Sequence, residues 1–379
     1  MNIPSSTTSD PLLQSACKIN YRHLLPIVMI AVIGGLLFGF DSGVVNGALG
    51  GLQKTFQMSE ALSGFSIAST LLGCALGALV SGHWSDKKGR KPVMFWTALL
   101  FLFSSIWSGV SYGSIDFIIS RILAGVAIGG ASVIIPTYIS EISPPSIRGR
   151  LGSLQQLAIV VGLLGAFLSN YGIIQLAGSS SAILAFGEEG WRWMFMVGAF
   201  PAFIFAVGVF FIPESPRYLV SIGKEREAIG FLEKISSADA PQCVGEIQES
   251  LKLKPTHSWR DLLDPLTGKL QPLVVVGVLL AIFQQLTGIN IVFYYGPVLW
   301  VLLGEMFENK NRGSAMALSA TALWITNFAV TLLFPICLKE FGAGMIYAGF
   351  AGVNFIAFLF VSRCLKETNN QKLEEAGQS

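Results

Sequence analysis

Charged residues are scarce in this sequence, because Lys, Arg, Asp and Glu make up only 13% of the 379 residues. That share is about half of what an average soluble domain carries. So low a charge content excludes the solvated surface of a soluble globular enzyme. The formal net charge is +2, which gives little electrostatic attraction for a nucleic acid, and we expect no nucleic-acid partner.

Cysteine and histidine are also few. The five cysteines show no C-x-x-C or paired spacing, and the three histidines have no neighbours typical of metal ligands. The sequence therefore predicts no disulfide framework, no metal site and no cofactor. It also shows no nucleophile with a partner base and no phosphate-binding loop, so we predict that the protein is not an enzyme.

Apolar residues and glycine are abundant instead, with 52% apolar residues and 41 glycines. Long apolar runs separated by short polar stretches are typical of transmembrane helices, in which glycine allows close packing. We predict an all-α polytopic membrane protein in contact with the lipid bilayer. Its nine apolar segments lie near residues 24–50, 61–82, 92–112, 116–139, 152–177, 191–212, 272–307, 314–336 and 341–363.

Lysine and arginine gather in alternate connections, after the second, fourth and sixth segments. They are Lys87, Lys88, Arg90 and Lys91, then Arg148 and Arg150, then eight Lys or Arg between residues 213 and 271. Because positive connections stay cytoplasmic, we predict a protein of the cell (inner) membrane with a cytoplasmic N-terminus. The run from Leu24 is too long for the core of a signal peptide, so we expect it to remain as the first span.

These patterns divide the chain into four regions. We predict a six-helix bundle over 1–212, a cytoplasmic linker with short helices over 213–271, a shortened helical bundle over 272–363 and a cytoplasmic tail over 364–379. Glu, six residues and then Arg-Gly occur in both halves, which suggests two related bundles. The spacing of the two copies implies that the second half lacks about 85 residues.

The segment 272–307 is where that loss falls, since it is too long for one span and too short for two. The positive residues that follow it favour a segment that doubles back inside the membrane. Helix length favours a single tilted crossing instead. The sequence leaves both topologies open.

Asp41 and Arg121 are charged residues inside apolar runs, where an unpaired charge is costly. With a rise of 1.5 Å per residue, their depths in a membrane core of about 30 Å differ by only about 4 Å, so they could pair. A carboxylate neutralised in turn by a proton and by an arginine suits proton coupling. A static structural ion pair is the alternative.

Six motifs together resemble the sugar porter family of the major facilitator superfamily, and within it the bacterial xylose and glucose proton symporters. They are Gly39-Phe40-Asp41-Ser42-Gly43-Val44, the turn Gly82–Lys91, Arg121 to Gly125, Glu141 with Arg148-Gly149-Arg150, Pro213–Leu219 and Gln284–Asn290. The resemblance runs from about Leu24 to Arg363. It implies the major facilitator fold, with a complete N-terminal six-helix bundle and a truncated C-terminal one. The family's eighth and ninth spans have no counterpart here, and the point at which the seventh span joins the tenth falls near Gly296.

The same resemblance implies which residues contact a sugar. Amide side chains offer a donor and an acceptor to each hydroxyl, and an aromatic face suits the apolar side of the ring. The implied contacts are Gln156, Gln284, Gln285, Asn290, Trp300, Trp324 and Asn327. Anchoring at the lipid interface is the alternative for the two tryptophans.

The resemblance also implies a cytoplasmic charge network that favours one conformation. Its members are Asp86, Arg90, Glu141, Arg148, Glu214, Arg217, Glu305 and Arg312. Asp86 could cap the helix that starts near Arg90 or pair with a basic residue. A solvated loop is the alternative for the whole set.

We therefore predict a secondary active transporter for a hexose or pentose, working by alternating access in symport with a proton. The substrate partner is a monosaccharide, and its identity stays open. The alternatives are a membrane protein that binds sugar without transporting it and a decayed remnant, because two spans of the second bundle are missing.

Overall fold

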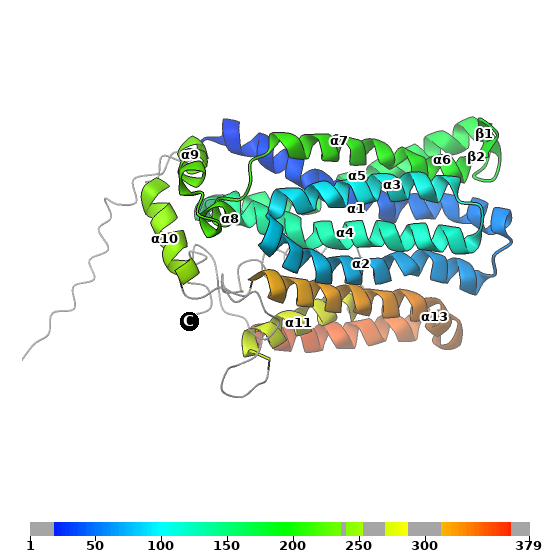
Figure 1. Cartoon of the computed structure of the whole chain (residues 1–379). Coiled ribbons are helices and arrows are strands. Elements are labelled where there is room, and N and C mark those ends of the chain that lie inside the picture. The colour runs from blue at the N-terminus through cyan, green and yellow to red at the C-terminus, as the bar shows by residue number, and fades with distance from the viewer. Residues whose placement is uncertain (1–18, 236–239, 253–269, 287–311, 365–379) are drawn as a thin grey trace, which may run out of the picture.

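The computed structural model describes residues 19–235, 240–252, 270–286 and 312–364. Six of the described helical segments are long and apolar enough to cross a membrane, and all lie in the first 212 residues. They form an elongated bundle whose helices run side by side (Figure 1). The all-α fold predicted from the sequence is confirmed, with one small hairpin in addition.

The first five spans are continuous helices. They are α1 (Tyr21–Phe56), α2 (Glu60–Lys88), α3 (Arg90–Val110), α4 (Ser114–Ile142) and α5 (Arg148–Ala177), with a short 3₁₀ turn η1 (Pro145–Ile147) before the last. α1 is 36 residues long, so it extends beyond the predicted run at both ends. The sixth span is broken at Gly198 into α6 (Gly190–Val197) and α7 (Ala199–Phe211).

A β-hairpin precedes the sixth span, formed by β1 (Ile183–Ala185) and β2 (Glu188–Glu189) in antiparallel pairing. Phe186 and Gly187 have positive φ angles in its turn, which is the region that glycine adopts without strain. The hairpin lies at one end of the bundle, and the short helices α8 (Pro216–Ser221), α9 (Glu225–Ile235) and α10 (Ala240–Lys252) lie at the other (Figure 1). We call these the hairpin end and the α8–α10 end.

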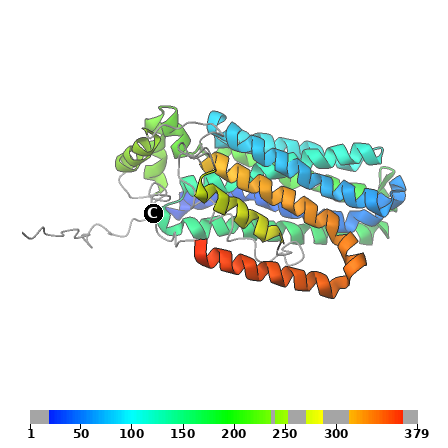
Figure 2. The ribbon, with the colours of Figure 1, turned by 90° about the horizontal axis from the view of Figure 1, so that it is seen from below.

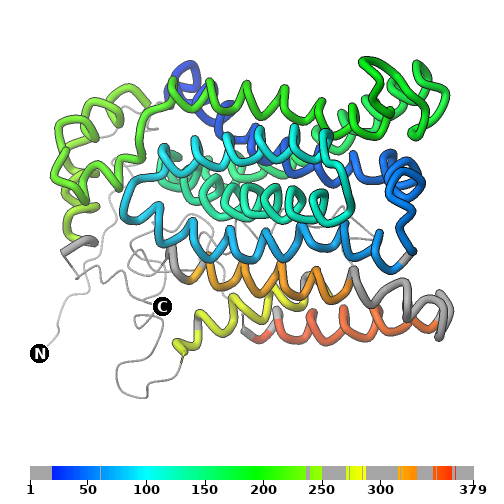
Figure 3. Tube along the Cα trace, turned by 45° about the vertical axis from the view of Figure 1, so that its right-hand side comes forward, coloured from blue at the N-terminus to red at the C-terminus, as the bar shows by residue number. Residues whose placement is uncertain are grey.

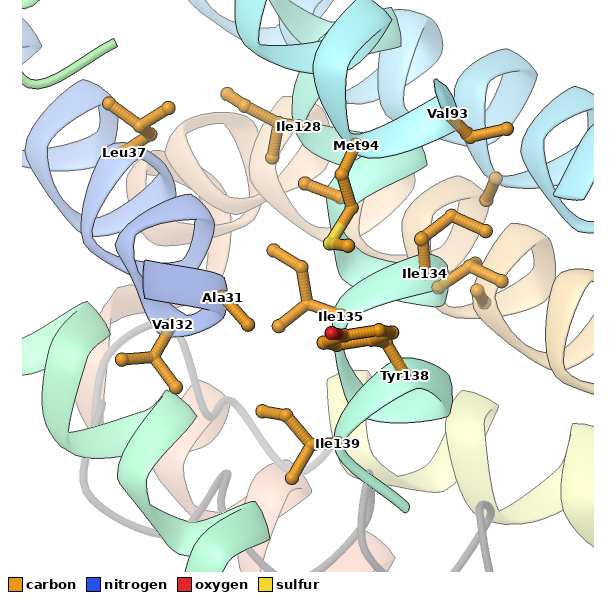
Figure 4. Close-up of a cluster of buried hydrophobic side chains, with 14 of the residues drawn as sticks. Ala31, Val32, Leu37, Val93, Met94, Ile128, Ile134, Ile135, Tyr138 and Ile139 are labelled. Carbon is orange, nitrogen blue, oxygen red and sulfur yellow. The ribbon is translucent and has the colours of Figure 1, made fainter. Parts of the chain in front are cut away.

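α4 is the most buried span, because it packs along α2, α3 and α1. Figure 4 shows Ile135 and Tyr138 of α4 pointing into a cluster with Ala31 of α1 and Met94 of α3. These four residues are almost fully buried. The interior of the first bundle is therefore built around one helix.

Glycines bring two helix pairs into backbone contact. A Cβ atom added at Gly39 of α1 would lie 1.9 Å from the Ile159 carbonyl oxygen of α5, and one added at Gly125 of α4 would lie 2.0 Å from the Thr70 carbonyl oxygen of α2. Only glycine permits so close an approach. α1 thus packs on α5 in the same manner as α2 packs on α4.

The second half contributes α11 (Pro272–Leu286) and α13 (Arg312–Cys364). The predicted segments 314–336 and 341–363 both fall within α13, which is 53 residues long. Figures 1 and 2 show that α13 does not run straight. Its first part lies along α2, and its last part runs back beside that first part in the opposite direction.

The starts of α11 and α13 both lie at the α8–α10 end (Figure 3). The chain has therefore returned to that end by residue 312, as the positive residues after the segment 272–307 favoured. A single crossing between these two helices, the alternative based on helix length, does not fit this arrangement. Residues 287–307 lie outside the described residues.

Candidate functional site

Asp41 and Arg121 lie in direct contact inside the first bundle. Arg121 Nη1 donates to Asp41 Oδ1 and Nη2 donates to Oδ2, both at 2.6 Å. The Asp41 side chain is 8% exposed and the Arg121 side chain 3% exposed, so the pair is shielded from solvent. α1 supplies the carboxylate and α4 the guanidinium, so the pair joins two helices that pack against each other. A two-pronged bond of this kind is the strongest geometry available to these groups.

The surroundings of the pair are apolar and aromatic. The Arg121 guanidinium lies over the ring of Phe195, 5.2 Å from the ring centre. Arg121 Nε is buried and has no hydrogen-bond partner among the residues that the structure describes. Each charge neutralises the other, so a proton added to Asp41 would leave the Arg121 cation without its counter-charge.

The amides expected to bind sugar occur on two helices. Gln156 is half-buried on α5, and Gln285 is buried near the end of α11 with a polar partner of its own. The backbone of Gln284 is helical, but its side chain is outside the described residues, as are Asn290 and Trp300. The structure therefore describes only part of the predicted sugar site.

Trp324 and Asn327 lie on the first part of α13 and are buried, at 2% and 6% exposed. Trp324 Nε1 donates to the Ser132 hydroxyl of α4 at 3.4 Å, and its ring meets Phe38 of α1 edge to face at 5.4 Å. Asn327 also has a polar partner. Trp324 thus reaches into the first bundle, and lipid anchoring, the alternative considered for it, does not fit this burial.

The charge network at the α8–α10 end centres on Arg90. Arg90 Nη2 lies 2.8 Å from Glu141 Oε1 and 3.3 Å from Asp86 Oδ1. Glu141 also accepts a short hydrogen bond from the Ser215 hydroxyl. Arg90 is 7% exposed and the Glu141 side chain 1%, so a solvated loop does not describe these residues.

Glu214 caps the start of α3. Its carboxylate accepts the backbone N–H groups of Arg90 at 2.9 Å and of Lys91 at 3.2 Å, where the helix dipole favours negative charge. Asp86 pairs with Arg90, and Glu214 bonds the N–H groups at the start of α3. Burial raises the pKa of the Glu214 carboxyl above its ordinary value, while the N–H bonds from Ser215, Arg90 and Lys91 and the charge of Arg90 oppose that rise.

The other predicted network members are described in part. Arg148 is buried and donates from Nε to the Ser140 carbonyl at 3.2 Å. Arg217 has a partner as well. Glu305 and the side chain of Arg312 lie outside the described residues. The part that is described ties α3, α4 and the chain before α8 together.

Sequence reasoning missed several polar contacts that complete these sites. Ser132 and Tyr138 were not singled out, and Ser215 entered only as part of the motif Pro213–Leu219. The Tyr138 hydroxyl donates to the Pro213 carbonyl at 2.8 Å. A second missed cluster lies at the hairpin end, where Trp191 Nε1 donates to Glu189 at 2.7 Å and to Thr55 at 3.0 Å. Aromatic and acidic residues beside Arg192 were its only sequence signal.

Within the residues that the structure describes, no three His, Cys, Asp or Glu side chains gather in a way that could hold a metal ion. The arrangement as a whole is a buried, protonatable ion pair in a helical bundle. Amide and indole side chains lie on the neighbouring helices α5, α11 and α13, and a charge network joins the helices at the α8–α10 end.

Comparisons with known proteins agree on the family. The family model described as "Sugar (and other) transporter" matches residues 27–299 and 296–379, so the two matches meet within the four residues 296–299. The glucose transport protein of Synechocystis sp. is 35% identical over 472 positions, covering 98% of this chain and 99% of that protein. An alignment this much longer than the 379 residues requires a stretch in the relative that has no counterpart here.

Several of the similar solved structures are of XylE, and the inward-open structure names it as the xylose transporter from E. coli. The structure titled as the proton:xylose symporter bound to 6-bromo-6-deoxy-D-glucose is 29% identical, with a TM-score of 0.85 and coverage of 95% of this chain and 99% of that one. The inward-open structure is also 29% identical and covers 94% of this chain and 99% of that one, but with a TM-score of 0.73. The family match and the whole-length relatives lead to one conclusion: the chain is an integral membrane protein that belongs to the sugar transporter family of the major facilitator superfamily.

Proposed function

We propose that this protein carries a monosaccharide, a hexose or a pentose, across the membrane in symport with a proton. The observation that carries the proposal is the buried two-pronged pair between Asp41 and Arg121. A glucose transport protein and a proton:xylose symporter among the related proteins support the substrate class and the coupling ion. The identity of the sugar is left to experiment.

In this proposal, Asp41 takes up the proton. Protonation removes the negative charge that holds the Arg121 guanidinium, so the contact between α1 and α4 loosens at that depth. Gln156, Gln284, Gln285 and Asn290 would bond the sugar hydroxyls, and Trp300, Trp324 and Asn327 would complete the site. The buried position of Trp324 between α1 and α4 supports this part, because it gives the sugar site and the ion pair shared helices.

The network at the α8–α10 end would favour the conformation in which that end is closed. The buried contacts that Arg90, Glu141 and Glu214 make at this end support this assignment. Asp86, Arg90, Glu141, Arg148, Glu214 and Arg217 would hold this end, with Glu305 and Arg312 as the expected partners from the second half. Opening it would require the contacts of Arg90 and Glu214 to rearrange.

We further propose that the protein is not an enzyme, lies in the cell (inner) membrane and has a cytoplasmic N-terminus. The positive residues at the α8–α10 end support that orientation. The second candidate function, sugar binding without transport, is less favoured because the relatives described above are transporters.

The test is uptake of labelled glucose and xylose by cells that lack their own carriers, with and without a protonophore. We expect accumulation that the protonophore abolishes. The Asp41→Asn variant should lose pH-driven accumulation but keep sugar exchange, because its neutral amide mimics the protonated carboxyl. Glu233→Gln, which removes an exposed carboxylate on α9, should behave as wild type. Accumulation that survives the protonophore, or equal loss of uptake and exchange in Asp41→Asn, would refute proton coupling through Asp41.

A further inference from the structure

The Arg121 guanidinium has two neighbours of opposite character. One is the Asp41 carboxylate, and the other is the face of the Phe195 ring, 5.2 Å from the guanidinium carbon. Phe195 is 3% exposed, so the ring and the cation share a site shielded from solvent. An aromatic face carries partial negative charge and attracts a cation, most strongly where water is excluded.

The ring is held in place by other aromatic residues. Phe117 of α4 meets Phe195 edge to face at 5.3 Å, and Trp191 of α6 does so at 6.4 Å. Trp191 is fully buried and is fixed by its bond to Glu189. Because its neighbours are fixed, the Phe195 ring has little freedom to turn away when the charge near Arg121 changes.

The effect of the ring differs between the two protonation states of the pair. With Asp41 ionised, the pair has no net charge, and the negative face of the ring attracts the guanidinium while it repels the carboxylate. With Asp41 protonated, the pair carries one positive charge, and only the attraction remains. The ring therefore stabilises the protonated state more than the ionised one.

We propose that Phe195 is a positioning residue whose ring stabilises the Arg121 cation while Asp41 is protonated. This inference rests on the proposed function, since it assigns the proton to Asp41. It makes Phe195 a determinant of the pH at which the pair opens. Phe195 touches neither sugar nor proton and acts through Arg121.

The other polar and titratable groups near the pair do not stabilise the Arg121 cation in place of Phe195. From α2 the Cys74 thiol interacts electrostatically with both Asp41 and Arg121, and it is neutral as a thiol. From α5 the neutral Asn170 amide bonds the Gly43 and Val44 carbonyls of α1. The charges closest to Phe195 along the chain pair with one another at the hairpin end, in the set Glu188, Glu189 and Arg192. Asp116, at the start of α4, bonds Trp107 and the Tyr112 N–H.

The test measures the thermal stability of the purified full-length protein in detergent as a function of pH. The quantity compared between variants is the midpoint of the pH-dependent change in stability that we expect in the wild type and not in Asp41→Asn. Phe195→Leu, which removes the ring but keeps apolar bulk, should move the midpoint of that transition to a lower pH by about half a unit to one unit. Phe195→Tyr, which keeps an aromatic face, should restore the wild-type midpoint.

Phe117→Leu is the matched control, because Phe117 belongs to the same aromatic cluster but its ring faces Phe195 and Trp191. It should lower stability at every pH and move the midpoint less than Phe195→Leu does, because the Phe195 ring itself remains beside Arg121. A Phe195→Leu midpoint equal to that of Phe117→Leu, or a wild type with no Asp41-dependent transition, would overturn the inference. Uptake measured in parallel tests the proposed symport separately from the role of Phe195. Uptake without proton dependence would refute the symport, while the stability curves would still decide the role of Phe195.

Discussion

Replacing Gly39 by alanine should separate α1 from α5. The added methyl group would lie 1.9 Å from the Ile159 carbonyl oxygen and 2.9 Å from the Leu163 backbone nitrogen, whereas ordinary contact begins at 3.4 Å. These are backbone atoms and cannot rotate away, so the helices must move apart by about 1.5 Å at the crossing. A gap of that size removes a large part of the dispersion energy between the facing side chains.

We estimate the net cost at about 3 kcal/mol, the upper part of the range for overpacking, after alanine's better helix propensity is allowed for. For a domain of this size, that corresponds to a fall of about 6 to 12 °C in Tm. The assay is thermal unfolding of the purified protein in one detergent, followed by fluorescence.

Gly165→Ala provides the matched control on the same helix pair. Gly165 lies on α5, and a Cβ atom added there would meet nothing within 4 Å. Its Tm should stay the same or rise slightly, because alanine favours the helix. We attribute the stability of the α1–α5 contact to the close backbone approach at Gly39. Equal changes in Tm for Gly39→Ala and Gly165→Ala would refute this attribution.

Two further predictions concern polar contacts outside the ion pair. Burial raises the pKa of Glu214 in the folded chain. Between the ordinary and the raised pKa, the folded chain therefore binds more protons than the unfolded chain. The free energy of unfolding should rise as the pH falls through that range. Glu214→Gln should remove this contribution, and a Tm profile against pH identical to that of wild type would contradict it. Trp191→Phe keeps the ring but leaves Glu189 and Thr55 without the indole N–H, which should cost about 1 to 3 kcal/mol in unfolding free energy. Trp193→Phe, which loses only a 3.4 Å bond to the Ala185 carbonyl, should cost less, and equal costs would argue against the cluster.

Sequence patterns predicted the spans well because each apolar run must be about as long as the membrane is thick. The same arithmetic anticipated that Asp41 and Arg121 lie at similar depths, since helix rise converts sequence position into depth. The break at Gly198 could not be seen in this way, because the residues on both sides of it are apolar.

Apart from the pair of Asp41 and Arg121, the contacts between distant segments were beyond sequence reasoning. Glu214 caps a helix that begins 124 residues earlier in the chain, and nothing local to Glu214 points to that partner. The bond between Trp324 and Ser132 has the same character, because it depends on how α13 lies against the first bundle. In both cases tertiary packing selects one partner among many that the chain offers.

The close glycine contacts have a consequence for the history of the chain. Gly39 and Gly125 meet residues of the first six spans alone, while an added Cβ atom at Gly349 or Gly352 of α13 would meet nothing within 4 Å. Among the glycines that the structure describes, these close backbone contacts lie within the first six spans. Shortening of the second half leaves these contacts intact, so a shortened chain can keep a folded first half on which natural selection still acts.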